Sequence, residues 1–193
     1  MKIHILFGMI GFILLSGCNR AAEKNPRFYD AGVSRELAGH RKAQIKNLKY
    51  ELSFNIPRQK EAAIEGDITL RFDLASRQEV LIDFREEREK IKEVIANGVP
   101  VDKVRFENEH IILPASSTVE GANGIRIRFT AGNQSLNRND EYLYTLLVPD
   151  RARTVFPCFE QPNLKAEFTL QLELPADWKA VSNTYIRSET VTD

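Results

Sequence analysis

Apolar and polar residues alternate along four separate stretches of this chain, at residues 48–56, 68–74, 125–129 and 168–174. Successive side chains of a β-strand point to opposite faces, so strict alternation predicts a strand with one face in the core and one in water. The first stretch reaches Pro57, a residue that cannot donate to a strand ladder. The pattern therefore predicts at least four half-buried strands.

Shorter apolar runs at residues 80–84 and 110–113 add further strands. Asn97-Gly98 lies between two apolar pairs and predicts a two-residue type I′ hairpin, because both central residues of that turn need a positive φ. Residues 34–47 are compatible with a short helix before the first strand. Several short strands separated by turn signals predict one all-β domain, an antiparallel β-sandwich, after a short helix or linker.

The first seventeen residues have the pattern of an export signal, because Lys2 precedes an apolar stretch that is too short to span a membrane. Residues 15–18, Leu-Ser-Gly-Cys, resemble the bacterial lipobox, in which the cysteine is acylated and the chain is cut just before it. We therefore expect Cys18 to be lipidated and to bind the chain to a membrane, since two or three acyl chains give lasting attachment. The alternative is an ordinary secretory signal with an incidental cysteine.

These features divide the chain into a lipoprotein signal peptide at residues 1–17, a tether at 18–33 and a folded β-domain at 34–193. The tether begins with polar, small and proline-punctuated residues, which are typical of a flexible spacer. Asn19 is not the aspartate that typically retains lipoproteins in the inner membrane. The resemblance to lipoproteins therefore implies a place in the cell envelope, at the outer membrane and facing the periplasm.

Charge and cysteine content exclude two kinds of protein. Lys plus Arg and Asp plus Glu both number 27, so the chain lacks the basic excess that phosphate backbones demand, and we expect no nucleic-acid partner. With Cys18 committed to lipid, Cys158 has no partner and no disulfide is expected. We interpret Cys158 as a small buried apolar residue rather than a nucleophile, because no histidine lies near it in sequence. The charged run at residues 85–92 has mixed signs, as a solvated connection does.

Three histidines occur in the chain, His4, His40 and His110, and they do not have the spacing of zinc ligands. The helix pattern His-Glu-x-x-His is absent, as are a Gly-x-Ser-x-Gly elbow and a phosphate-binding glycine loop. We interpret Glu107 and Glu109, beside His110, as polar residues of a strand edge rather than as ligands. The residues alone therefore predict no catalytic group and no metal site.

Residues 151–162 read Arg-Ala-Arg-Thr-Val-Phe-Pro-Cys-Phe-Glu-Gln-Pro, and the alternating stretch 168–174 follows. This segment resembles the aminopeptidase N family of gluzincin-type zinc aminopeptidases, in which an arginine precedes Phe-Pro-Cys-Phe-Asp-Glu-Pro, then Lys-Ala-x-Phe and a strand. The resemblance covers about residues 46–183. The matching residues are Arg153, Phe156, Pro157, Cys158, Phe159, Glu160, Pro162 and Lys165.

That resemblance implies a saddle-shaped N-terminal β-domain followed by a helical domain with Gly-x-Met-Glu-Asn for the substrate and His-Glu-x-x-His for zinc. Neither motif is present, so we expect the catalytic domain to be absent, this chain to be inactive by itself, and zinc and peptide substrates to belong to the full-length enzyme. The inherited reaction is removal of an N-terminal residue by zinc-activated water. Two alternatives stay open: a stand-alone lipid-anchored binding or scaffold domain, and an inactive gene remnant.

The resemblance further implies that the corner at residues 156–162 adjoins the active-site cleft. Two prolines and the apolar anchors Phe156 and Phe159 predict a rigid corner, which we expect to expose apolar area and to pack on the downstream domain. This expectation places the corner on an interface between two domains.

The resemblance also implies a substrate contact upstream of this corner. Val148, five residues before Arg153, stands where the family usually has the glutamine or glutamate that binds the substrate ammonium. Valine has no acceptor, so we expect Glu141 or Asp150 to replace it on the cleft wall, unless the alignment slips before Arg153.

Overall fold

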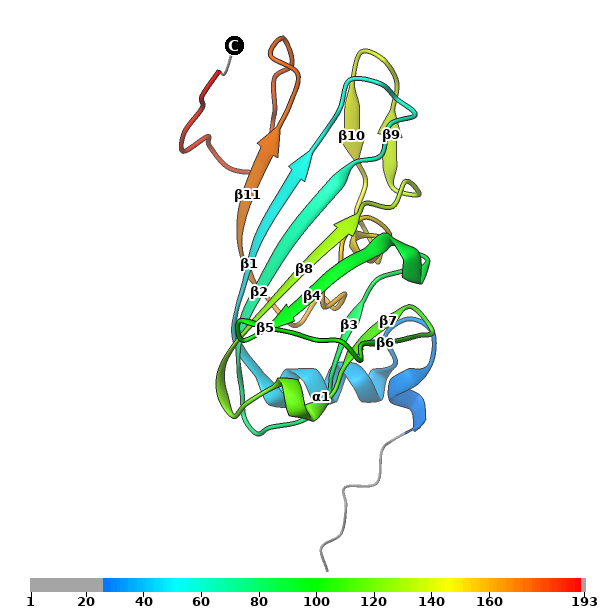
Figure 1. Cartoon of the computed structure of the whole chain (residues 1–193), viewed down its shortest axis with the longest axis vertical. Helices are drawn as coiled ribbons and strands as arrows, with labels where there is room; N and C mark the ends of the chain where they lie inside the picture. Colours follow the sequence, from blue (N-terminus) through cyan, green and yellow to red (C-terminus); the bar gives the residue numbers. More distant parts are fainter. Residues whose placement is uncertain (1–25, 192–193) are drawn as a thin grey trace, which may run out of the picture.

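The computed structural model describes residues 26–191 (Figure 1), and within this range the chain forms eleven strands, one α-helix and four 3-10 helices. The strands are β1 (Ile45–Asn55), β2 (Glu65–Leu74), β3 (Val80–Asp83), β4 (Ile91–Ala96), β5 (Val99–Pro100), β6 (Arg105–Glu107), β7 (His110–Leu113), β8 (Gly121–Thr130), β9 (Leu136–Arg138), β10 (Leu143–Thr145) and β11 (Glu167–Glu173). The helices are η1 (Pro26–Tyr29), α1 (Arg35–Gln44), η2 (Arg88–Lys90), η3 (Ala115–Ser117) and η4 (Ala152–Thr154). The expected signal peptide and Cys18 lie outside the described residues.

A six-stranded sheet in the order β11-β1-β2-β8-β4-β5 forms the body of the domain (Figure 1). The four stretches of alternating residues are neighbours in it, as parts of β11, β1, β2 and β8, which confirms the β-rich fold. All of its pairings are antiparallel except one, because β11 runs parallel to β1 with Tyr50 opposite Phe168. The long excursion between β8 and β11 returns the chain to the edge of the sheet in that direction.

Along β1, β2 and β8 the two faces of this sheet differ as the alternation predicts, whereas β11 is largely exposed on both faces instead of half-buried, because it is an edge strand. One face supplies the core, where Ile68, Leu70, Ile125 and Ile127 are fully buried. The other face carries cross-strand ion pairs, such as Arg71 Nε with Glu51 Oε1 at 2.8 Å. Apolar burial on one face and solvated charge pairs on the other stabilise a single register, because a one-residue slip would exchange the faces.

A three-stranded sheet in the order β3-β7-β6 packs over the core face, and its strands β3 and β7 are buried on both sides. Ile82 and Ile111 contribute to the core between the sheets, whereas Leu81 and Ile112 pack with Leu37 of α1. This double burial explains why residues 80–84 and 110–113 lack alternation. The domain therefore has three layers: the large sheet, the small sheet and α1.

Helix α1 is shorter than the stretch 34–47 allows. Ser34 caps it, since its Oγ accepts the Leu37 N–H at 3.1 Å, and β1 begins directly after Gln44. Residues before the helix also contact the domain, because Asn108 Nδ2 donates to the Tyr29 carbonyl at 2.7 Å. The part of the expected tether that is described, residues 26–33, therefore lies against the β6–β7 turn.

Two hairpins project from this body. Asn97 and Gly98 have φ values of 52° and 81° between β4 and β5, which confirms the predicted type I′ turn. The β9–β10 hairpin forms a separate two-stranded sheet at the end opposite α1 (Figure 1). Among residues 26–191, no helix has the length and apolarity that crossing a membrane requires.

Candidate functional site

The signature segment, residues 151–162, runs through the interior of the domain. Phe156, Cys158 and Phe159 are each only 4% exposed, and the Phe159 ring lies edge-on to Phe72 at 5.6 Å. The expectation that this corner exposes apolar area for a downstream domain is therefore wrong. Its aromatic side chains fill the core of their own domain, because the space between the two sheets closes around them.

Backbone hydrogen bonds fix the signature segment to the end of β3. The Asp83 N–H donates to the Cys158 carbonyl at 2.8 Å, and the Cys158 N–H donates to the Asp83 carbonyl at 3.0 Å. The Arg85 N–H donates to the Arg153 carbonyl at 2.7 Å. The Phe159 N–H donates to the Tyr50 hydroxyl at 2.9 Å. A segment outside regular secondary structure thus satisfies its buried polar groups.

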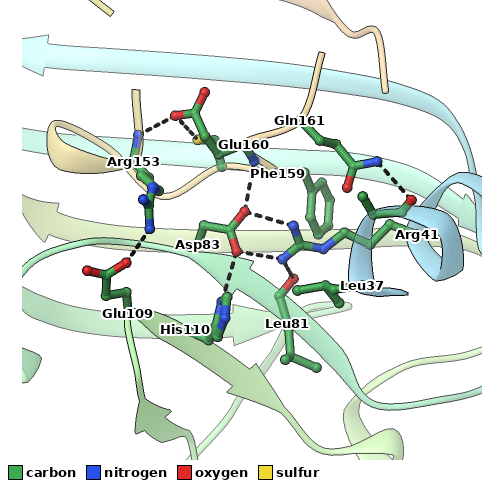
Figure 2. Close-up of polar contacts among 12 residues, drawn as sticks. Leu37, Arg41, Leu81, Asp83, Glu109, His110, Arg153, Phe159, Glu160 and Gln161 are labelled. Atoms are coloured by element: carbon green, nitrogen blue, oxygen red, sulfur yellow. Dashed lines mark hydrogen bonds and ion pairs between the residues drawn. The ribbon is translucent and has the colours of Figure 1, made fainter. Parts of the chain in front are cut away.

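Asp83 is the centre of a buried polar cluster (Figure 2). Both of its oxygens bind the guanidinium of Arg41, with Nη1 to Oδ2 at 2.8 Å and Nη2 to Oδ1 at 2.6 Å. His110 Nδ1 lies 2.8 Å from Oδ1, and its Nε2 donates to the Asp30 carbonyl at 2.9 Å. The Glu160 N–H donates to Oδ2 at 2.8 Å. Three distant parts of the chain therefore meet at one carboxylate.

Protein groups, rather than solvent, stabilise the charge of the buried Asp83 carboxylate. Burial by itself would raise the pKa of this carboxyl, since an ionised group loses its hydration. The guanidinium of Arg41 and the hydrogen bond from His110 outweigh burial and lower the pKa to about 2. Asp83 therefore stays ionised at neutral pH and serves as a fixed acceptor rather than as an acid or base.

Arg153 organises a second cluster at the start of the signature segment. Its guanidinium pairs with Glu109, and its Nη2 lies 3.3 Å from Asp150 Oδ2. Its N–H donates to Glu160 Oε2 at 2.8 Å. Glu109 lies in the turn between β6 and β7, and its carboxylate also pairs with Arg85 at 3.1 Å, so it has two ion-pair partners that its sequence context did not indicate.

Cys158 is a small buried residue, as its sequence context indicates. Burial, followed by the charges of Glu160 and Asp83, raises the pKa of its thiol well above the usual value. Its Sγ donates to Glu160 Oε2 at 3.9 Å, and burial also raises the pKa of Glu160. A thiol that stays protonated is a poor nucleophile, so Cys158 has a packing role here.

The remaining signature residues differ in their exposure to solvent. Pro157 is buried, whereas Pro162 and Lys165 are exposed. Between them, Gln161 Nε2 donates to the Ala38 carbonyl of α1 at 3.1 Å. The sequence motif therefore marks a structural connection within this domain.

The described residues do not fit a zinc site. His40 Nε2 donates to Gln78 Oε1 at 2.6 Å, and both ring nitrogens of His110 face oxygen atoms inside the fold. Among residues 26–191, no three His, Cys, Asp or Glu side chains are grouped as a metal ion requires.

The expected substrate-wall residues surround the β9–β10 hairpin. Glu141 lies in its turn, where the Asn139 side chain accepts the Glu141 N–H at 2.8 Å. Val148 lies just beyond β10 and is 77% exposed, and Asp150 is bound by Arg153. The structure thus places the three candidates on one short segment but separates Glu141, at the tip, from Val148 and Asp150, at the base.

An apolar ridge runs along this segment and was not predicted. It consists of Tyr142, Tyr144, Leu146 and Val148, which are 52%, 48%, 51% and 77% exposed. The side chains between them, Leu143 and Leu147, pack against the core. Alternation over residues 142–148 was the available signal, but apolar residues occupy both faces there, so the period does not show which face is solvated.

The family comparison agrees with the signature residues. Residues 46–193 match the family model described as the Peptidase M1 N-terminal domain. The chain is 32% identical over 166 residues to aminopeptidase N of Streptomyces lividans, which covers 79% of this chain and 19% of that protein. It is 25% identical over 156 residues to leucine aminopeptidase 2 of Candida glabrata, covering 71% and 23%. The chain thus spans about a fifth of the length of these relatives.

Two of the solved structures that share this fold are the following. Yeast LTA4 hydrolase aligns with a TM-score of 0.57 and 20% identity over 69% of this chain and 24% of its own. The M1 zinc metallopeptidase of Deinococcus radiodurans aligns with a TM-score of 0.55 and 18% identity over 67% and 32%. The resemblance to the aminopeptidase N family is confirmed, and the chain belongs to the M1 family of zinc aminopeptidases through its N-terminal domain.

Proposed function

We propose that this domain forms one wall of the substrate cleft in a zinc aminopeptidase that removes N-terminal residues from peptides. Zinc, its ligands and the catalytic glutamate belong to the helical domain that follows this one in the family. The apolar ridge is the observation that carries the proposal. Four neighbouring large apolar side chains in water are costly unless they meet a partner, so a ridge of this kind marks a binding surface.

The base of the ridge is held by the signature segment. Asp150, two residues after Val148, is bound by Arg153 through its carboxylate and its carbonyl. Arg153 is in turn fixed by Glu109 and by the carboxylate of Glu160. A cleft wall needs such support, because a binding surface on a loose hairpin loses affinity to ordering entropy.

The substrate ammonium is bound by Glu141 in this proposal rather than by Asp150. Asp150 already pairs with Arg153, which neutralises its charge. Glu141 is exposed, and within residues 26–191 its carboxylate forms no ion pair. An acceptor at Glu141 would bind the ammonium from the tip of the hairpin, whereas the glutamine or glutamate of the family stands at the position of Val148, at its base.

The test uses a fusion of this domain to the downstream catalytic half, with a free-amine peptide as substrate. Glu141→Gln removes the charge and should raise KM about tenfold or more, since a charge-assisted hydrogen bond contributes roughly 1.5–3 kcal/mol. Val148→Gln should lower KM by supplying an acceptor. The matched control is Glu120→Gln, which changes an exposed carboxylate just before β8 and outside the β9–β10 hairpin. Unchanged KM in both hairpin variants would show that this segment does not touch the amine.

We also propose that Cys18 anchors the protein to the outer membrane on its periplasmic side. The support is the lipobox-like tetrad at residues 15–18 and the asparagine at position 19.

A further inference from the structure

We infer that residues 26–44, which precede the region matched to the family, form an intramolecular clasp whose Arg41 holds the signature segment in place. This inference does not depend on the proposed cleft function. It concerns a part of the chain for which the family model supplies no counterpart. Its basis is the buried ion pair that joins α1 to the end of β3.

The clasp is seated by apolar contacts on the outer face of the small sheet. Leu37 is 1% exposed and packs with Leu81 and Ile112, and Phe28 of η1 covers the same cluster. This docking carries Arg41, one turn further along the helix, into the interior, where its side chain is 3% exposed. An arginine is rarely buried that deeply unless it is paired, and here its partner is the equally buried Asp83.

Arg41 touches the signature segment through two routes. Its guanidinium fixes both oxygens of Asp83, and one of these oxygens accepts the Glu160 N–H at 2.8 Å. The same guanidinium lies over the Phe159 ring, 5.2 Å from its centroid (Figure 2). A third donor bond runs from Arg41 Nη2 to the Leu81 carbonyl at 2.8 Å. The planar fork is required here, since a lysine cannot bind two oxygens and stack on a ring at once.

A separate contact between the clasp and the signature segment lies one turn away. Gln161 Nε2 donates to the Ala38 carbonyl at 3.1 Å. Helix α1 therefore contacts the signature segment at Phe159, through Asp83 at Glu160, and at Gln161. Undocking of α1 would remove both bonds from Arg41 to the buried Asp83 and would free the residues next to Cys158.

The reactivity of the Cys158 thiol reports whether α1 holds the signature segment in place. It is buried, it forms backbone bonds with Asp83, and Cys18→Ala leaves it as the sole thiol of the chain. In that background, Arg41→Lys should raise the labelling rate of Cys158 by Ellman's reagent about tenfold, because local opening exposes the thiol. Lys42→Ala, on the exposed side of the same helix, is the matched control and should label at the parent rate.

A double variant separates the clasp from simple loss of stability. Arg41→Met with Asp83→Asn removes both charges, so no unpaired ion stays buried and the thermal midpoint should return close to that of the parent. Cys158 should still label about tenfold faster, since α1 no longer holds Asp83 and Glu160. Parent-like labelling in the double variant, or labelling that rises only as the midpoint falls, would overturn the inference.

Amide exchange in the parent chain gives an independent measurement that needs no variant. The Glu160 N–H, which donates to Asp83, should exchange together with the amides of α1 and faster than those of β2 and β8. Exchange of Glu160 at the rate of the β2 and β8 amides would mean that the segment opens only on global unfolding. That result would also overturn the clasp.

Discussion

Asp83 makes the stability of this domain depend on pH in the acidic range. Its pKa is about 2 in the folded protein, below the value of roughly 3.9 for an unfolded aspartate, so the unfolded chain binds the extra proton first. The stabilisation is present above pH 4 and is lost as the pH falls through 4 towards 2. We expect this group to account for on the order of 2 kcal/mol of that loss, measured by urea unfolding at pH 6, 4 and 2.

The control for Asp83 is Glu51, an exposed carboxylate whose pKa is also lowered, by the hydrogen bond from Arg71. Water screens that pair, so Glu51→Gln should leave most of the acid dependence in place. Asp83→Asn lowers stability at pH 6 because Arg41 stays buried and unpaired, but it should flatten the dependence below pH 4. Equal slopes in Asp83→Asn and in the parent would contradict this account.

Individual residues differ in how far their sequence context reveals them. The burial of Cys158 followed from its residue type and apolar neighbours. The pairing of Arg41 with Asp83 did not, because 42 residues separate them and neither lies in a motif. The ion pair of Glu109 with Arg153 was missed for the same reason, since Arg153 lies 44 residues further along the chain. Only the packing of α1 and the signature segment against β3 and β7 brings these charges together.

At the scale of elements, the chain just after β8 passes very close to the signature segment. A Cβ on Gly132 would lie well inside van der Waals contact of the Thr154 carbonyl oxygen and of the Glu86 carboxylate. Gly132→Ala should therefore destabilise the domain by roughly 1–3 kcal/mol through forced backbone displacement, measured by urea unfolding. Gly124→Ala, within β8, meets only the tip of Arg71 at 3.6 Å and should cost much less. Equal losses in the two variants would show that the close approach is not required.

The corner at residues 156–162 was expected to expose apolar area, but in the structure exposed apolar side chains lie on β11, an edge strand of the large sheet. Phe168 is 55% exposed and Leu170 is 45% exposed, both on the face that continues the core. Unpaired edges with apolar side chains promote association. Phe168→Lys should therefore lower the binding of an apolar dye and light scattering at high protein concentration. Thr169→Lys adds the same charge on the opposite face and should change dye binding little. Equal effects would assign the change to net charge.

The strands that could be predicted from the sequence are those with a face in water, because a solvated face produces alternation of apolar and polar residues. Strands β1, β2, β8 and β11 alternate because each has a solvated face, and the β4–β5 turn shows its positive φ values in Asn-Gly. The small sheet is buried on both faces, so its strands appear only as apolar runs. The parallel pairing of β11 with β1 was not predictable, because it depends on the path of the chain between β8 and β11.

The two ends of the described domain carry different elements. Helices η1 and α1 lie at one end, where the described chain begins, and the β9–β10 hairpin with the apolar ridge lies at the other (Figure 1). Eight peptide steps separate Cys18 from Pro26, so a lipidated Cys18 would hold the folded domain within about 28 Å of the membrane surface. In that proposed arrangement the end that carries the clasp is tethered near the bilayer, and the ridge lies at the opposite end of the domain (Figure 1).

This arrangement requires lipid on Cys18, and radiolabelled palmitate fed to expressing cells should enter the protein. Two or three acyl chains bind a bilayer lastingly, so the labelled protein should sediment with membranes and resist extraction by high salt. Cys18→Ala should abolish both label and sedimentation, whereas Cys158→Ala should keep them, because Cys158 is enclosed in the core and is no lipid acceptor. Undiminished label and membrane association in Cys18→Ala would show that the tetrad at residues 15–18 is an ordinary signal end. The short distance between clasp and membrane would then no longer hold, while the fold and the ridge would be unaffected.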